Sequence, residues 1–318
     1  MAMTDRTLAT ISAQFSTLVG SLAQQSTNKT APSTMFKTGL KGNVPQLITY
    51  ISKVTLTTLT NAQLRVVHDT AAATPTADTR YLPAPEEKRV KFLFAEESDL
   101  LRLVSMESGL IQETNKAFQR EKDISFVKAF LGNAITSLTW TDAVTTPGSE
   151  APGNLQLPMS YVPLPAGNTI TATAGSTITA NLKKVLKFFE ANDVDWRALG
   201  LRLYHNSKFA ELLRKDAEWY TWNTAGATPN ATGELKPYLG FEFIQLSEID
   251  ILNAANGAAD KMLIAAGKPV CTGIWKDFNT TTSIRHDKDE AIQINSYMML
   301  SSARLNEWQV CVLDISAL

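Results

Sequence analysis

The sequence predicts a protein of the α+β class, and three observations support this prediction. Helical and strand-like periodicities follow one another in irregular order, without an internal repeat. One long amphipathic segment occupies residues 108–131, and two alternating segments, 291–300 and 308–315, close the chain. A regular alternation of strands and helices would instead favour a parallel sheet, so the irregular order indicates α+β.

The composition is that of a folded, cytoplasmically made protein. Of 318 residues, 44% are hydrophobic and 19% are charged, which suffices for a core and excludes a disordered chain. The formal net charge of −1 argues against a dedicated reader of nucleic-acid sequence. The start lacks a secretory signal, and no window reaches the roughly 20 apolar residues of a membrane span. Cys271 and Cys311 are expected as free, buried thiols, with a disulfide as the alternative.

Residues 1–63 are expected to form an N-terminal arm. Residues 1–45 are rich in Ser, Thr, Asn, Gln and Ala, so we expect an extended segment that orders only against neighbouring molecules. Residues 1–65 contain six Lys and Arg but only Asp5 as an acid, a charge of +5. This excess favours an arm that faces a polyanion. A solvated tail with a chance excess of charge explains it equally well.

Residues 64–95 predict an extended hairpin. LRVVHD alternates, a polar tip with three prolines follows, and KRVKFLF returns with Val90, Phe92 and Phe94 on one face. An isolated hairpin is marginal in water, so this one is expected to lie on something else.

Residues 108–131 predict a long amphipathic helix. The segment has no proline, and Leu110, Ala117, Ile124 and Leu131 recur every seven residues. A coiled coil is a weaker alternative. Gly132 is typical of a helix end. A shorter helix is expected at 98–104, and the turn-rich stretch 138–176 marks an internal boundary.

The remainder predicts a compact α+β unit. A helix is expected at 177–191, a strand at 199–204, and then a short helix capped by Ser207. Further strands are expected, in addition to the two that close the chain, at 240–246, 261–265 and 269–274.

Motifs of catalysis, metal binding and phosphate binding are missing from the sequence. The three histidines are far apart, and the cysteines lack a C-x-x-C spacing, so neither a metal nor a cofactor is expected. The charged run 285–290 fits a solvated turn better than a calcium loop. His205 stands where a strand meets a helix, a place that can hold a catalytic base, although Asn206 and Ser207 beside it also suit a helix N-terminus.

In this order the elements resemble the tailed-phage major capsid family, with its Hong Kong 97-like fold. The most specific local match is Arg120 and Asp123 in REKD, followed by ISFVKAFLG, which resembles the R-x-x-D pattern late in the spine helix of that family. Asp99 is similar to an acidic position before that helix. LGFEFI, from Leu239, resembles the family's G-F-x-(V/I) strand, which follows a Leu-Leu helix, here at Leu212.

The resemblance covers most of residues 45–318 and implies a division of the chain. Its parts are an N-terminal arm (1–63), an extended hairpin loop (64–95), a spine helix with a peripheral domain (96–176), an axial domain (177–300) and a C-terminal strand that returns to the peripheral domain (301–318). The family has no catalytic residues to carry over.

The resemblance further implies a major capsid protein that self-assembles, as pentamers and hexamers, into an icosahedral shell around phage double-stranded DNA. It would be assembled in the host cytoplasm, beside a portal protein and, because the arm is short, a separate scaffolding protein. DNA would be bound non-specifically through its phosphates. Candidate DNA-facing residues are Lys29, Lys37 and Lys41. Candidate contacts between subunits are Arg80, Glu86, Glu87, Lys88 and Arg89.

Two alternatives stay open from the sequence. One keeps the fold and makes the chain an encapsulin-like compartment shell protein. The other, of a different class, is a small hydrolase or transferase that uses His205.

Overall fold

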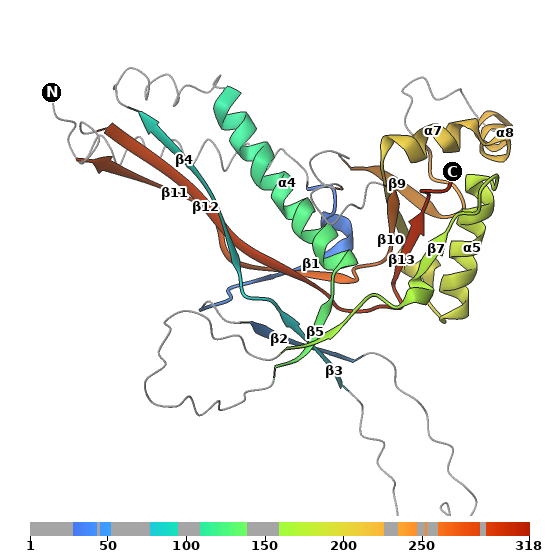
Figure 1. Ribbon diagram of the computed structural model, residues 1–318, viewed down its shortest axis with the longest axis horizontal. Helices are drawn as coiled ribbons and strands as arrows, with labels where there is room; N and C mark the ends of the chain where they lie inside the picture. The colour runs from blue at the N-terminus through green and yellow to red at the C-terminus, as the bar shows by residue number, and fades with distance from the viewer. Residues whose placement is uncertain are drawn as a thin grey trace, which may run out of the picture.

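The computed structural model describes residues 28–42, 45–51, 77–94, 109–138, 159–225, 235–246, 252, 260–286 and 291–318. These residues form three sheets, with one long helix lying between two of them (Figure 1). The mixture of helices and antiparallel-rich sheets confirms the α+β class. The helix is α4 (Gly109–Leu131), as the periodicity predicts.

The first sheet, here the ribbon sheet, has the order β1-β11-β12-β4. Its long antiparallel strands β11 (Val270–Arg285) and β12 (Ala291–Arg304) extend side by side beneath α4 (Figure 1). Strand β4 (Glu86–Phe94) pairs antiparallel with β12, and β1 (Thr34–Thr38) pairs parallel with β11.

The ribbon sheet is joined to α4 by a small apolar cluster. Phe118 of α4 packs with Met298 and Leu300 of β12, and the partly buried Val90 and Phe278 adjoin them. The helix therefore rests on the face of β4 that carries Val90 and Phe92, as the alternation predicts.

The second sheet, here the five-stranded sheet, has the order β7-β13-β10-β8-β9. Its strands are β7 (Thr169–Thr171), β8 (Leu201–His205), β9 (Phe241–Gln245), β10 (Lys261–Ala266) and β13 (Val310–Asp314). The short 3-10 helix η2 (Ala166–Asn168) precedes β7. Four helices accompany the sheet: α5 (Ile178–Ala191), α6 (Trp196–Leu199), α7 (Ser207–Lys215) and α8 (Ala217–Ala225).

Both faces of the five-stranded sheet are buried, because alternate residues of β10 enter two different cores. Met262 and Ile264 join the core made with α5 and α7. Leu263 and Ala265 join the core made with α4. The sheet thus separates α5 and α7 from α4.

The third sheet, here the corner sheet, has the order β2-β3-β5-β6. Its strands are β2 (Gln46–Ile51), β3 (Ala77–Leu82), β5 (Ala134–Leu138) and β6 (Met159–Val162). Strand β5 starts three residues after α4 ends, so the helix leads directly into this sheet.

The glycine of the GFEFI motif has a structural reason. Gly240 has φ +82°, and a Cβ at this position would lie 2.6 Å from the ring of Trp196. Only glycine fits the turn before β9 without displacing the Trp196 ring.

The hairpin region contains pairings that the sequence did not predict. Strand β4 pairs with β12, far away in sequence, and Ala77–Leu82, expected within the polar tip, is strand β3 and pairs with β2. The pairing of residues 64–69 with β4 stays a prediction. Residues 64–69, expected as the first strand, lie outside the described residues, as do 98–104 and Asp99. Sequence alternation identifies strands but carries no information about distant partners.

The N-terminal segment also differs from the expected arm. Residues 28–42 pack within their own subunit: η1 (Ala31–Ser33) is followed by β1 on the edge of the ribbon sheet. They therefore do not depend on a neighbour for order. Residues 1–27 lie outside the described residues.

Two local predictions need correction. The side chain that caps α7 is Asn206, whose Oδ1 accepts a hydrogen bond from the Phe209 amide at 2.8 Å, and Ser207 is the first helical residue. On α4, Ala117, Ile124 and Leu131 are only half-buried, whereas Phe126 and Phe130 are fully buried. The helix contacts two sheets in turn, so a single seven-residue repeat does not mark its core face.

The domain division stays a prediction. Strand β13, expected to return to the region 96–176, pairs with β7 of that region on one side and with β10 on the other.

Candidate functional site

Arg304, at the end of β12, lies at the centre of the described structure and is 0% exposed. One guanidinium nitrogen donates to the carbonyls of Phe130 (3.0 Å) and Gly132 (2.6 Å), and the other donates to Val162 O at 3.2 Å. The last carbonyls of a helix have no partner within the helix. Arg304 therefore closes the C-terminal end of α4 with a positive charge, which the helix dipole favours.

Glu307 brings a second arginine to the same place. Its carboxylate accepts hydrogen bonds from Arg80 of β3 at 3.0 and 3.1 Å and lies 3.7 Å from the Arg304 Nε. Asn168 holds the Glu307 carbonyl at 2.5 Å and the Val310 carbonyl at 2.8 Å. We call these four residues the junction, since they connect α4, the ribbon sheet, the corner sheet and the start of β13.

The buried positive charge of Arg304 is balanced within the junction. Burial lowers the pKa of Arg304, and the Glu307 carboxylate opposes that effect. An arginine remains charged in either case, so the buried positive charge is neutralised by carbonyl dipoles and by Glu307. A buried charge of this kind is tolerated only when it is paired and hydrogen-bonded.

Asp123, singled out by the R-x-x-D pattern, anchors the N-terminal segment. It is buried on α4, and its Oδ1 accepts a hydrogen bond from the Thr30 amide at 3.1 Å. Burial raises the pKa of Asp123, and the Thr30 hydrogen bonds act against this. Lys29 Nζ donates to the Gln245 carbonyl at 2.7 Å, so the segment bridges α4 and β9.

Four of the charged residues expected to meet a neighbour, those at 86–89, lie on two faces of β4. Lys88 turns toward α4 and bridges Glu86 and Glu121, each at 2.9 Å. Partial burial lowers the pKa of Lys88, but the hydrogen bonds to Glu121 and Glu86 outweigh it, and the pKa is raised. Glu87 and Arg89 form an exposed ion pair on the opposite face.

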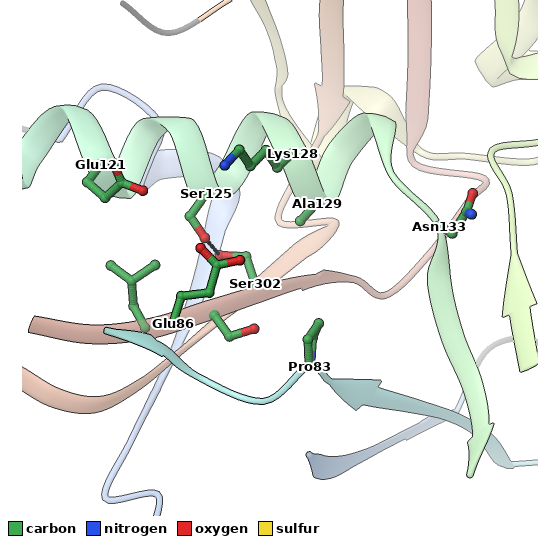
Figure 2. Close-up of a pocket in the computed structure, with 10 residues that line it drawn as sticks. Pro83, Glu86, Glu121, Ser125, Lys128, Ala129, Asn133 and Ser302 are labelled. Carbon is green, nitrogen blue, oxygen red and sulfur yellow. Dashed lines mark hydrogen bonds between the residues drawn. The ribbon is translucent and has the colours of Figure 1, made fainter. Parts of the chain in front are cut away.

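A cavity of about 180 Å³ lies between α4, β12 and the start of β4, and most of its lining residues are polar (Figure 2). Figure 2 shows Ser125 of α4 directed at Ser302 of β12, and their hydroxyls are 2.8 Å apart. Glu86 and Glu121 line the same cavity, as does Lys128, and Lys88 bridges the two carboxylates. Among the described residues, no cluster of His, Cys, Asp and Glu has the arrangement of a metal site.

His205 is placed as a core residue. It is 3% exposed, its Nδ1 donates to the Asn206 carbonyl at 2.8 Å, and its ring packs between Phe209 and Phe243. Burial lowers the pKa of His205. An imidazole whose Nδ1 is committed to a backbone carbonyl within an aromatic core suits structure better than proton transfer at a site open to substrate.

Acidification is expected to destabilise the subunit through His205. Because its pKa in the fold lies below the ordinary 6.5, its stabilising contribution is complete above that value and is lost as the pH falls through the lowered pKa. Denaturant titrations between about pH 7 and pH 5 should show a smaller fall in unfolding free energy for His205→Gln than for the parent chain. Equal falls would contradict this account.

The structure also shows an apolar row that the sequence did not reveal. Leu47, Tyr81, Ile135 and Tyr161 lie opposite one another across the four strands of the corner sheet and so share one face. The row is exposed at its two ends, where Leu47 is 46% and Tyr161 is 54% exposed, whereas Ile135 between them is 5% exposed. The strands that carry them are only four to six residues long, and their order is not readable from alternation. We call these four residues the corner row.

The predicted site residues are thus dispersed. Arg80 is bound inside the subunit, Glu86 and Lys88 face α4, and Lys29 contacts β9. Lys37 and Lys41 are exposed, although Lys37 Nζ also lies 3.4 Å from the Leu47 carbonyl. Among the described residues, no helix is both long enough and apolar enough to cross a bilayer.

Comparisons with known proteins agree with this arrangement. The family model described as "Phage capsid protein" matches residues 8–316. No curated protein sequence matches the chain.

Among solved structures, the chain is similar to the asymmetric unit of the bacteriophage PhiM1 mature capsid, with TM-score 0.60, 10% identity, and 90% of this chain and 86% of that chain covered. It is similar to the capsid of cyanophage P-SCSP1u, with TM-score 0.59, 11% identity, and 90% and 87% covered. A chain of Mycobacterium phage Che8 gives TM-score 0.55 and 14% identity, with 86% and 85% covered.

At these identities the structures show a shared fold, the Hong Kong 97-like fold that the element order predicts. The family model spans nearly the whole chain. The chain therefore belongs to the phage capsid protein family.

Proposed function

We propose that this major capsid protein assembles, as pentamers and hexamers, into a closed icosahedral shell around double-stranded phage DNA in the host cytoplasm. The observation that carries the proposal is the family match over residues 8–316. The formal net charge of −1 supports it, since nearly neutral copies repel one another little when they pack. A portal protein and a separate scaffolding protein are the further partners we infer.

The fold contributes to assembly by presenting surfaces, and no reaction step is needed. The exposed Glu87–Arg89 pair on β4 and the corner row are the surfaces we assign to contacts between subunits. Weak contacts repeated around a closed array give a strong whole, because each added subunit makes several contacts at once. Arg80 and Lys88 are turned toward Glu307 and Glu121 of their own subunit, so we assign them a role inside it, whereas Glu86 is 65% exposed and stays among the proposed contacts. The compartment-shell alternative gains no support from the family match.

Negative-stain electron microscopy of the purified chain, alone and co-expressed with the proteins of neighbouring genes, tests the proposal. Closed shells, or rings of five or six subunits, are expected. Uniform monomers or dimers in both preparations would overturn it.

Lys37 and Lys41 are proposed to face the packaged DNA, since both are exposed and no acid in the described structure pairs with them. Replacing both by glutamine should weaken DNA binding by assembled shells and reduce the slope of log affinity against log salt by about one unit per lysine. Lys184 and Lys187, exposed on α5, provide the matched double substitution. An equal effect of the two pairs would contradict a specific role for Lys37 and Lys41.

Removing residues 1–27 should leave the subunit folded, because the contacts of Thr30 and β1 lie beyond the cut. Removing residues 1–42 should destabilise it, because β1 and the Thr30–Asp123 hydrogen bond are lost. Thermal melting of both truncated chains checks this, and equal melting temperatures would contradict the anchoring of residues 28–42.

A further inference from the structure

Among the described residues, apolar and polar contacts hold the corner sheet to the rest of the subunit. In the apolar cluster, Ile48 and Leu82 meet Cys271, Ala303 and Leu305. Two arginines supply polar contacts: Arg80 of β3 pairs with Glu307, and Arg304 donates to the Val162 carbonyl at the end of β6. Apolar contacts are not directional, so the orientation of β2 and β3 depends on the Arg80 pair.

The carboxylate that accepts the Arg80 hydrogen bonds belongs to a residue with further partners. Arg80 donates one nitrogen to both oxygens of Glu307. Glu307 is in turn fixed by Asn168 at its carbonyl and by the nearby Arg304. Arg304 is itself tied to the end of α4. A charge-assisted hydrogen bond to a carboxylate held in this way fixes the distance of β3 from the junction, and the apolar cluster supplies a second attachment that limits rotation about it.

We propose that Arg80 is a positioning residue for shell assembly: its ion pair with Glu307 sets the orientation of the corner sheet, and with it the direction in which the corner row meets a second copy of the chain. This inference rests on the proposed self-assembly. The side chain of Arg80 lies on the inner face of β3, whereas its neighbour Tyr81 belongs to the corner row on the outer face. One strand thus carries both the fixing group and the contact surface.

Replacing Arg80 leaves the other contacts of the junction in place. Glu307 keeps Arg304 at 3.7 Å, and Arg304 keeps its three carbonyl partners. The Arg80→Met variant therefore retains a paired Glu307 and much of the apolar volume of the side chain. Arg80→Lys restores the charge on a more flexible side chain that lacks the planar guanidinium. Arg202→Met is the matched control, because it removes a partly exposed arginine that pairs with Glu242 of the five-stranded sheet and donates to the Pro32 carbonyl, far from the corner sheet.

The experiment combines hydrogen exchange on dissociated subunits with electron microscopy of assembly mixtures. In Arg80→Met we expect the amides of β2 and β3 to exchange about tenfold faster, those of the five-stranded sheet to be unchanged, and closed shells to be replaced by open or irregular particles. Arg80→Lys should recover part of both effects, and Arg202→Met should assemble as the parent chain does.

Three results would overturn the proposal. They are normal shells from Arg80→Met, lost assembly without faster exchange in the corner sheet, and equally faster exchange in all sheets. Failure of the parent chain to assemble would instead refute the proposed function, and the exchange data would still report whether Arg80 holds the corner sheet.

Discussion

Replacing Arg304 by methionine is expected to lower the free energy of unfolding by about 3–5 kcal/mol, the cost of breaking a buried charge network. The carbonyls of Phe130, Gly132 and Val162 would lose their donor in a place that excludes water. A buried acceptor without a partner costs about 1–3 kcal/mol. The C-terminal end of α4 would also lose a favourable charge.

Urea denaturation of the dissociated subunit, followed by far-UV circular dichroism, measures this loss. Arg202→Met is again the control, because its partner Glu242 is largely exposed and such pairs contribute about 1 kcal/mol or less. A loss no greater than that of Arg202→Met would show that the junction is not the structural centre of the subunit.

Replacing Phe126 by alanine is expected to cost about 3–5 kcal/mol, as for other fully buried aromatic side chains. The ring packs against Phe130 at 5.7 Å and against Tyr204 of β8 at 5.4 Å between ring centres. It therefore joins α4 to the five-stranded sheet, and its removal leaves a cavity between them.

The matched control is Phe36→Ala on β1, since Phe36 is 43% exposed and surface substitutions change stability by about 0.5 kcal/mol or less. Both variants are measured by denaturation of the dissociated subunit. Equal losses at the two positions would contradict the assignment of Phe126 to the core.

The elements predicted correctly are those whose pattern is local. The helix α5 has its apolar side chains at helical spacing, and Thr177, expected as its first residue, is the cap that accepts a hydrogen bond from the Ala180 amide. Strand β10 was predicted from a short apolar run, and β12 from an alternating run. Each of these signals depends on neighbours within a few residues, so no knowledge of distant contacts is needed.

The junction could not be predicted, because its members are far apart in sequence. Arg80 and Glu307 are 227 residues apart, and in the sequence each reads as an ordinary surface charge. Arg304 is the last residue of a largely apolar strand, and this position is the local indication of its burial. The charged cluster at 86–89 was treated as one surface, although strand alternation assigns its members to two faces. Asp123 was identified by its family pattern, and the structure adds its partner, Thr30.

The pairing of β1 with β11 has a consequence for the timing of synthesis. The sheet that contains residue 34 is completed only when residues up to 304 have been made, so the ribosome must release nearly the whole chain before this sheet closes. Contacts of such long sequence separation slow folding. Residues 34–38 therefore acquire their place in the sheet late, after most of the chain has been synthesised.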